Sequence, residues 1–159
     1  MRAAVITVST SRARGEGEDE SGRRLSELAA RIGAEVTSTE VIPDDRELIA
    51  GRLRYLADEE GCDLVMTTGG TGFAPSDVTP EATLAVVERE APGIPEAMRA
   101  ASREHTRHWM LSRAAAGVRG STLIVNFPGS PPSIEQAGGA IAEALPHALD
   151  LIAGRRTHH

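Results

Sequence analysis

Lysine is missing from this 159-residue sequence, in which all 17 basic residues are arginine. A phosphate-binding P-loop of the GxxxxGK[ST] type needs a lysine, so that class of nucleotide site is excluded. Catalysis through a lysine Schiff base is excluded for the same reason. Any bound polyphosphate must therefore be held by arginine, backbone N–H groups, helix N-termini or a metal ion.

Cysteine, aromatic residues and long apolar runs are also scarce. Cys62 is the only cysteine, which rules out an intrachain disulfide and a CxxC pair. The apolar run at 3–8 is too short for a signal sequence, and no run approaches the length of a membrane span. A net charge of −6 gives no general attraction for nucleic acid or anionic lipid. We expect a cytoplasmic protein that binds neither nucleic acid nor membranes.

The periodicity of apolar residues predicts strands alternating with helices. The length fits one domain, which we place at residues 1–154, followed by a solvated tail at 155–159. Strands are expected at 3–8, 34–42, 63–68 and 121–127, with a short edge strand near 112–118. Helices are expected at 21–32, 80–90, 94–106 and 134–152, the last with a kink or restart at Pro146, and a further helix follows the turn and cap at Pro43-Asp44. This alternation indicates an α/β fold with a mostly parallel sheet and helices on both faces.

The segment TTGGTGFAPSDVTPEAT, residues 67–83, follows the third strand. Gly69, Gly70 and Gly72 allow positive φ and let backbone N–H groups approach an anion closely. Thr79 followed by Pro80 predicts a helix cap and first residue, which brings a helix N-terminus to the same loop. An aspartate beside phosphates requires a cation between them, so Asp77 is a candidate Mg²⁺ ligand. Alternatively, Asp77 only stabilises the turn.

Two other loops are expected at the same edge of the sheet, because ligands bind beyond the carboxyl ends of parallel strands. In the loop after the first strand, Asp19 and Ser21 lie at the start of a helix, where they either face the ligand or only cap the helix. After the fourth strand, the turn Pro128-Gly129 is followed by Ser130, a predicted cap for another helix. An ordinary strand-to-helix turn explains Ser130 equally well.

Histidine and the larger aromatic residues give no further site. His105, His108 and His147 lack the spacing of metal ligands. Trp109 and Tyr55 are isolated in the sequence and provide no stacking platform for single-stranded nucleic acid.

Four segments occur together and in this order along the chain: EDESG at 18–22, the segment at 67–83, MLSRAAAGVRGSTLIVNFPGSP at 110–131 and ALPHALDLI at 144–152. In this the chain resembles the MoaB and Mog family of molybdenum cofactor biosynthesis proteins, which includes the G domain of gephyrin. The resemblance implies a three-layer α/β/α molybdopterin-binding fold and a homotrimer. It also implies transfer of AMP from Mg-ATP to molybdopterin, with release of pyrophosphate and a molybdenum insertase as partner.

The resemblance also assigns roles to residues of this sequence. Asp77 matches the essential aspartate of the family, which implies a catalytic and metal-binding role. Substrate and nucleotide binding are implied for twelve residues: Asp19, Ser21, Gly22, Gly69, Gly70, Thr71, Gly72, Ser112, Arg113, Pro128, Gly129 and Ser130.

Two positions depart from the pattern of many relatives. Ser76 stands where many have arginine, and Thr10 where many have an acid. Loss of an arginine beside the phosphates leaves a catalytically silent molybdopterin-binding or carrier trimer as an alternative to the transferase. A nucleotide pyrophosphatase-like hydrolase is the third interpretation, because related domains occur in pyrophosphatase-like proteins.

Overall fold

A six-stranded sheet forms the centre of the protein in the computed structural model, which describes residues 1–155. The strands are β1 (Arg2–Val8), β2 (Glu35–Ile42), β3 (Leu64–Thr68), β4 (Arg89–Glu90), β5 (Ala116–Arg119) and β6 (Thr122–Phe127), in the spatial order β2-β1-β3-β6-β5-β4. The four strands β2, β1, β3 and β6 are parallel, whereas β5 pairs antiparallel with β6 and with β4. The predicted mostly parallel sheet is confirmed.

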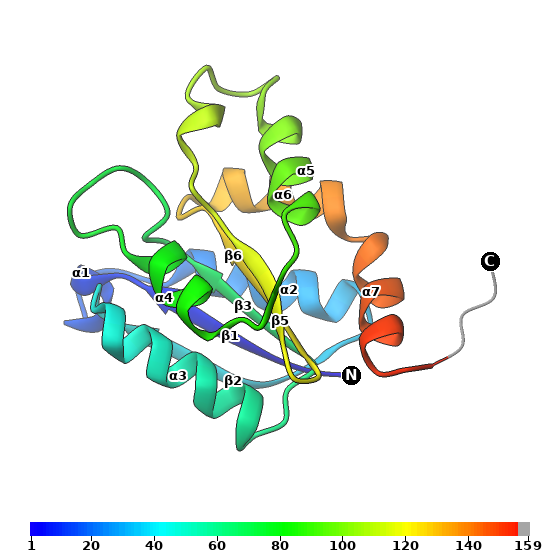
Figure 1. The fold of residues 1–159 in the computed structure, drawn as a ribbon. Helices are drawn as coiled ribbons and strands as arrows, with labels where there is room; N and C mark the ends of the chain where they lie inside the picture. The colour runs from blue at the N-terminus through cyan, green and yellow to red at the C-terminus, as the bar shows by residue number, and fades with distance from the viewer. Residues whose placement is uncertain (156–159) are drawn as a thin grey trace.

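Helices cover both faces of this sheet, which gives the predicted three layers (Figure 1). The helices are α1 (Thr10–Ala13), α2 (Glu20–Arg31), α3 (Arg46–Asp58), α4 (Thr79–Val86), α5 (Gly93–Ser102), α6 (Pro131–Ile141) and α7 (Ala144–Ile152), with a 3₁₀ turn η1 (Trp109–Leu111). Helices α3 and α4 pack on one face, and α2, α5, α6 and α7 pack on the other.

The central strands are buried on both faces, as their continuous apolar sequences require. In β1, Ala3 and Val5 contact the layer of α2 and α6, while Ala4 and Ile6 contact the layer of α3. Asn126 in β6 is among the buried polar residues of these strands, and its amide donates to Thr67 and Thr83 Oγ1 at 3.0 and 2.8 Å. Because these hydroxyls belong to β3 and α4, the network fixes α4 over the centre of the sheet.

Two predicted helices end earlier than their sequence patterns indicate. The helix expected at 80–90 ends at Val86, and Arg89–Glu90 forms the edge strand β4. Pairing with β5 overrides the helical pattern, because Glu88 N–H donates to Val118 O and Ala91 N–H to Ala116 O. The helix expected at 94–106 likewise ends at Ser102. The strand expected near 112–118 is β5 at 116–119, and it lies inside β4 rather than at the edge.

Two predicted helix caps are wrong by one residue. Asp45, rather than Asp44, caps α3 by accepting a hydrogen bond from Leu48 N–H at 3.0 Å. Thr79 is the first residue of α4 instead of its cap, and the cap residue Val78 has no side-chain acceptor. At α3 the Asp44 carboxylate accepts hydrogen bonds from Thr10, which leaves the capping of the helix to Asp45.

The C-terminal stretch restarts as predicted, with α6 ending at Ile141 and α7 beginning at Ala144. Pro146 lies in the first turn of α7, where its missing N–H costs no helical hydrogen bond. Of the predicted tail at 155–159, Arg155 forms an ion pair with Asp150, and 156–159 lie outside the described residues. Within residues 1–155, no helix combines the length and the apolar character that crossing a membrane requires.

Candidate active site

The carboxyl ends of β1, β3 and β6 lie side by side, and the loops that follow them enclose a cleft of about 220 Å³. Each loop contributes to its lining: Ser21 from the first, Gly69 from the second and Gly129 from the third. Arg12, on the short helix α1, adds a positive charge. The predicted meeting of three loops at one sheet edge is therefore observed.

Asp19 holds the first loop to the end of β1. Its carboxylate accepts hydrogen bonds from Thr7 Oγ1 at 2.8 Å and from Gly22 N–H at 2.9 Å, so it is the N-cap of α2. Gly22 leaves no room for a side chain, since a Cβ would lie 2.2 Å from Asp19 Oδ2 and 2.7 Å from Thr7 Oγ1. These contacts make Asp19 and Gly22 part of the framework of the cleft; Asp19 also lines the cleft, and the binding role of both residues stays a prediction.

Direct hydrogen bonds connect the three loops. Ser21 Oγ donates to Gly129 O at 2.7 Å, which joins the first loop to the turn after β6. Thr68 Oγ1 donates to Pro128 O at 2.6 Å, which joins the same turn to the end of β3. Ser130 caps α6 as predicted, accepting a hydrogen bond from Ser133 N–H at 3.4 Å. The N-terminus of α6 therefore starts at the wall of the cleft.

The glycine loop after β3 requires glycine at its first two positions. Gly69 has φ +96°, and a Cβ there would lie 2.3 Å from Val8 O. Gly70 has φ +69°, and its carbonyl accepts the first N–H of α4, from Thr79, at 3.1 Å. Thr71 is buried, and its carbonyl accepts Arg113 N–H at 2.8 Å. Figure 1 shows this loop reaching out beside α1 at the end of the sheet.

Asp77 is half-buried at the far end of the glycine loop. Its Oδ2 accepts Ala74 N–H at 3.0 Å, and a Cβ at Gly72 would lie only 2.9 Å from the same oxygen. Its Oδ1 takes part in no hydrogen bond within residues 1–155. No group of three metal-ligating side chains occurs in the described part of the chain. A single carboxylate with one available oxygen fits Mg²⁺, which commonly takes one or two carboxylates together with substrate phosphates and water.

Arg113 fixes the position of this aspartate. Its guanidinium donates to Gly72 O at 2.7 Å, to Asp77 O at 2.8 Å and to the Glu81 carboxylate at 2.7 Å. Hydrogen bonding to Arg113 also lowers the pKa of Glu81. The resemblance implied substrate binding for Arg113, whereas the structure shows its donors engaged by the loop and by α4.

A second carboxylate, missed in the sequence, lies at the same edge. Asp44 follows β2 and accepts hydrogen bonds from Thr10 N–H at 3.1 Å and Thr10 Oγ1 at 2.8 Å. Its Oδ1 is 3.3 Å from where a Cβ of Gly70 would lie. The sequence could have indicated Asp44 through its position just after a predicted parallel strand, because the carboxyl ends of all the parallel strands meet at this edge of the sheet.

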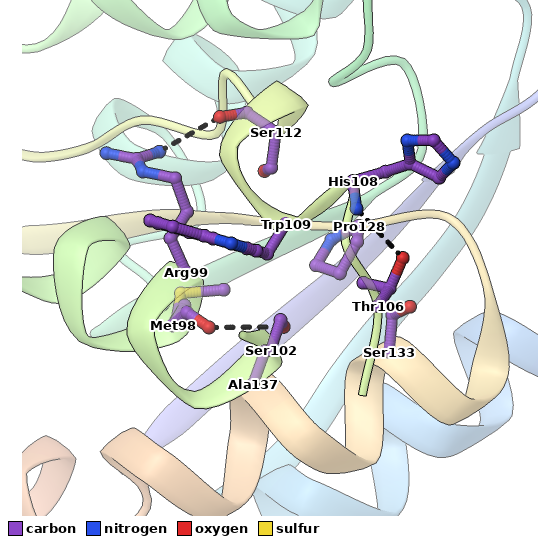
Figure 2. A pocket seen from close by; sticks show the side chains of 10 residues that line it. All are labelled: Met98, Arg99, Ser102, Thr106, His108, Trp109, Ser112, Pro128, Ser133 and Ala137. Carbon is purple, nitrogen blue, oxygen red and sulfur yellow. Dashed lines mark hydrogen bonds between the residues drawn. The ribbon is translucent and has the colours of Figure 1, made fainter. Parts of the chain in front are cut away.

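A second cleft, of about 250 Å³, lies on the other side of the turn after β6 (Figure 2). Pro128 lines this cleft and Gly129 lines the first, so the turn separates them. Ser112, a predicted site residue, opens into the second cleft, as does Trp109. No role is predicted for Trp109 from the sequence, because an isolated aromatic residue is weighed there only as a stacking platform for single-stranded nucleic acid.

Comparison with known proteins agrees with this geometry. The family profile described as "Probable molybdopterin binding domain" matches residues 4–147, which is most of the chain. The chain belongs to this family. The family predicted from the sequence motifs is thereby confirmed.

Individual relatives are similar over most of this chain. A molybdopterin adenylyltransferase of Helicobacter pylori strain J99 is 40% identical over 152 residues, covering 94% of this chain and 86% of the relative. The solved structure of the molybdopterin biosynthesis enzyme MoaB from Thermus thermophilus is 45% identical, with a TM-score of 0.91 and 97% of each chain covered. That of MogA is 34% identical, with a TM-score of 0.90, covering 96% of this chain and 99% of that one.

Gly22→Ala tests whether the framework of the first cleft requires a residue without a side chain at this position. The added Cβ would displace Asp19 or Thr7, so we expect a loss of about 1–3 kcal/mol in the free energy of unfolding. Gly51→Ala is the matched control, because Gly51 is also helical and has nothing within 4 Å of its Cβ position. It should gain about 0.5–1 kcal/mol. Urea denaturation measures both; equal changes would contradict the assignment.

Proposed function

We propose that the protein is a molybdopterin adenylyltransferase of molybdenum cofactor biosynthesis, which transfers AMP from Mg-ATP to molybdopterin and releases pyrophosphate. The observation that carries this proposal is a pair of clefts that share the turn Pro128-Gly129, one of them lined by Gly69 of the glycine loop that carries Asp77; Asp77 itself lines neither cleft. An adenylyl transfer needs two substrates whose phosphates meet, and two clefts that adjoin at Pro128-Gly129 suit that need. The activity named for relatives at about 40% identity supports the same reaction.

The chain's own groups would bind and align the phosphates. Backbone N–H groups of the glycine loop offer hydrogen-bond donors to phosphate oxygens. The N-terminus of α6 begins with Pro131 and Pro132, which have no N–H, so it contributes the partial positive charge of the helix rather than donors. Asp77 would hold Mg²⁺, which when bound neutralises charge on the triphosphate. Arg113 keeps the aspartate in place through its bonds to Gly72 O and Asp77 O.

The reaction then needs alignment rather than proton transfer. An oxygen of the terminal phosphate of molybdopterin attacks the α-phosphorus of ATP, and the bond from that phosphorus to the oxygen bridging it to the β-phosphorus breaks. Pyrophosphate leaves with the electron pair of that bond. Because the attacking oxygen is already anionic, no general base is required, and positioning with electrostatic stabilisation supplies the rate.

A silent molybdopterin-binding or carrier protein is the second candidate, favoured by Ser76. This residue is exposed on the glycine loop, one position before Asp77, and its hydroxyl brings no charge to the phosphates. A carrier would bind molybdopterin but release no pyrophosphate from ATP, so measuring pyrophosphate separates the two candidates.

Asp77→Asn tests the proposed metal ligand. The amide oxygen can still accept Ala74 N–H, so the fold should survive, while the negative charge is lost. We expect a fall in AMP transfer of about a thousandfold, or ~4 kcal/mol in transition-state stabilisation.

Asp63→Asn is the matched control for this loss of charge. Asp63 also accepts one backbone N–H, from Arg2 at 2.8 Å, but it lies at the amino end of β3. Its rate should match that of the parent at saturating Mg²⁺. An Asp77→Asn protein that melts normally and keeps more than about a tenth of the parental rate would defeat the metal-ligand role.

We further propose a cytoplasmic homotrimer that passes its product to a molybdenum insertase. A groove of about 380 Å³ between α5 and α7 supports self-association, because it is lined only by apolar residues and glycine, among them Ile94, Ala97 and Leu145. Light scattering at micromolar concentration should give three times the chain mass of 16.8 kDa. A monomer under those conditions would rule out the trimer.

A further inference from the structure

We propose that the second cleft binds the flat nitrogen heterocycle of one substrate, stacked against Trp109. Adenine and pterin share this chemistry, since both are planar fused rings edged with nitrogen atoms. The inference deepens the proposed function and rests on it for the identity of the substrates. The stacking itself rests on the geometry of the cleft.

The size and lining of the cleft suit a single ring system. Its volume of about 250 Å³ is below the roughly 300–1,000 Å³ of pockets that enclose whole drug-sized ligands. It would therefore take one heterocycle, with the phosphate end of the molecule outside. Met98 and Ala137 are buried and give it an apolar base, while Ser102, Ser112 and Ser133 place hydroxyl groups around it. Apolar surface with a few polar groups is the usual composition of such a site.

Trp109 is held where a ring could stack on it. The residue is half-buried, and the guanidinium carbon of Arg103 lies over its ring at 5.8 Å from the centroid. Arg103 does not line the cleft, so the indole presents to the cleft a surface that this cation does not cover. In Figure 2 the viewer sees the indole nearly edge-on, and it lies between Ser112 and Ser102.

Arg99 supplies hydrogen-bond donors for the edge of a heterocycle. Its Nη1 donates to Ser112 O (Figure 2) and to Ala114 O, both at 3.2 Å, and these bonds anchor the guanidinium at the cleft. Within residues 1–155, Nε and Nη2 make no hydrogen bond. Both groups are obligatory donors, and the ring nitrogens and carbonyl oxygens of purines and pterins are acceptors. Stacking on Trp109 and donation from Arg99 would together fix the orientation of the ring.

The position of the cleft directs the rest of the ligand toward the glycine loop. Pro128 lines the second cleft, and the adjoining Gly129 approaches the glycine loop so closely that its Cβ would lie 3.5 Å from Gly69 Cα. On the other side, Arg113 N–H donates to Thr71 O at 2.8 Å, which ties the segment after Ser112 to the same loop. A substrate with its ring beside Trp109 would thus extend its phosphate to the proposed transfer site.

Binding of two small probes, AMP and 6-hydroxymethylpterin, tests this inference. Equilibrium dialysis against the parent, Trp109→Leu and Trp109→Phe gives a Kd for each probe. Base stacking on an aromatic side chain accounts for roughly five- to a hundredfold in affinity, so Trp109→Leu should weaken one of the probes by that factor. Trp109→Phe should restore most of the loss. The probe that weakens identifies the heterocycle.

Tyr55→Leu is the matched control, because Tyr55 also carries an arginine over its ring, Arg52 at 4.6 Å, but lies on α3. It should bind both probes as the parent does. Trp109 is the only tryptophan, so the emission of the parent itself reports contact with the bound ring. This second readout decides the matter if Trp109→Leu does not fold: one probe should change the emission on binding, and binding of both probes without any change in the emission overturns the stacking.

AMP transfer in the same proteins separates this inference from the proposed function. If the parent is active, Trp109→Leu should raise the KM of one substrate with little change in kcat. Unchanged Kd and KM for both substrates, or failure of the parent to bind either probe, would overturn the inference. A parent that makes no adenylylated pterin, while Trp109→Leu still loses affinity for one probe, would refute the transferase and leave the ring site standing.

Discussion

The close approach of the glycine loop to the end of β1 is the constraint on which the site depends. Val8 O occupies the space that a Cβ of Gly69 would need, at 2.3 Å, and the φ of +96° turns the chain back across the sheet edge. Only glycine adopts this conformation without strain. The turn then delivers Gly70 O to the first N–H of α4 and places Asp77 beside Gly72. The location of the carboxylate thus follows from the packing of two backbones.

The distribution of charge explains how an acidic chain could bind two anionic substrates. Arg113 is engaged by the glycine loop and Glu81, and Arg119 by Asp58 and Val86 O, so both serve the framework. Arg12 and Arg99 are the arginines that line the two clefts, one in each. With so few side-chain cations, backbone N–H groups and a metal ion on Asp77 would provide most of the compensation.

Local patterns predicted the fold and the placement of three loops at one edge, because apolar periodicity and glycine positions act locally. They failed where distant partners decide. Residues 89–90 pair with β5 instead of continuing the predicted helix. Asp44, the predicted cap of α3, instead accepts a hydrogen bond from Thr10. Trp109 looked isolated because its cleft is made from α5, the turn after β6 and α6. The binding role of Arg113 stays a prediction, and the folded chain shows in addition that Arg113 bonds the loop carrying Asp77.

Transfer of the α-phosphorus from ATP to molybdopterin is the central claim, and isotopic labelling at that atom tests it most directly. The protein is incubated with Mg²⁺, molybdopterin and ATP labelled at the α-phosphorus, and the products are separated. The account predicts label in an adenylylated pterin and one pyrophosphate released for each AMP transferred. Label that stays in ATP while molybdopterin is bound would show a carrier. Label released as free AMP without the pterin would show a hydrolase; either result would contradict the account.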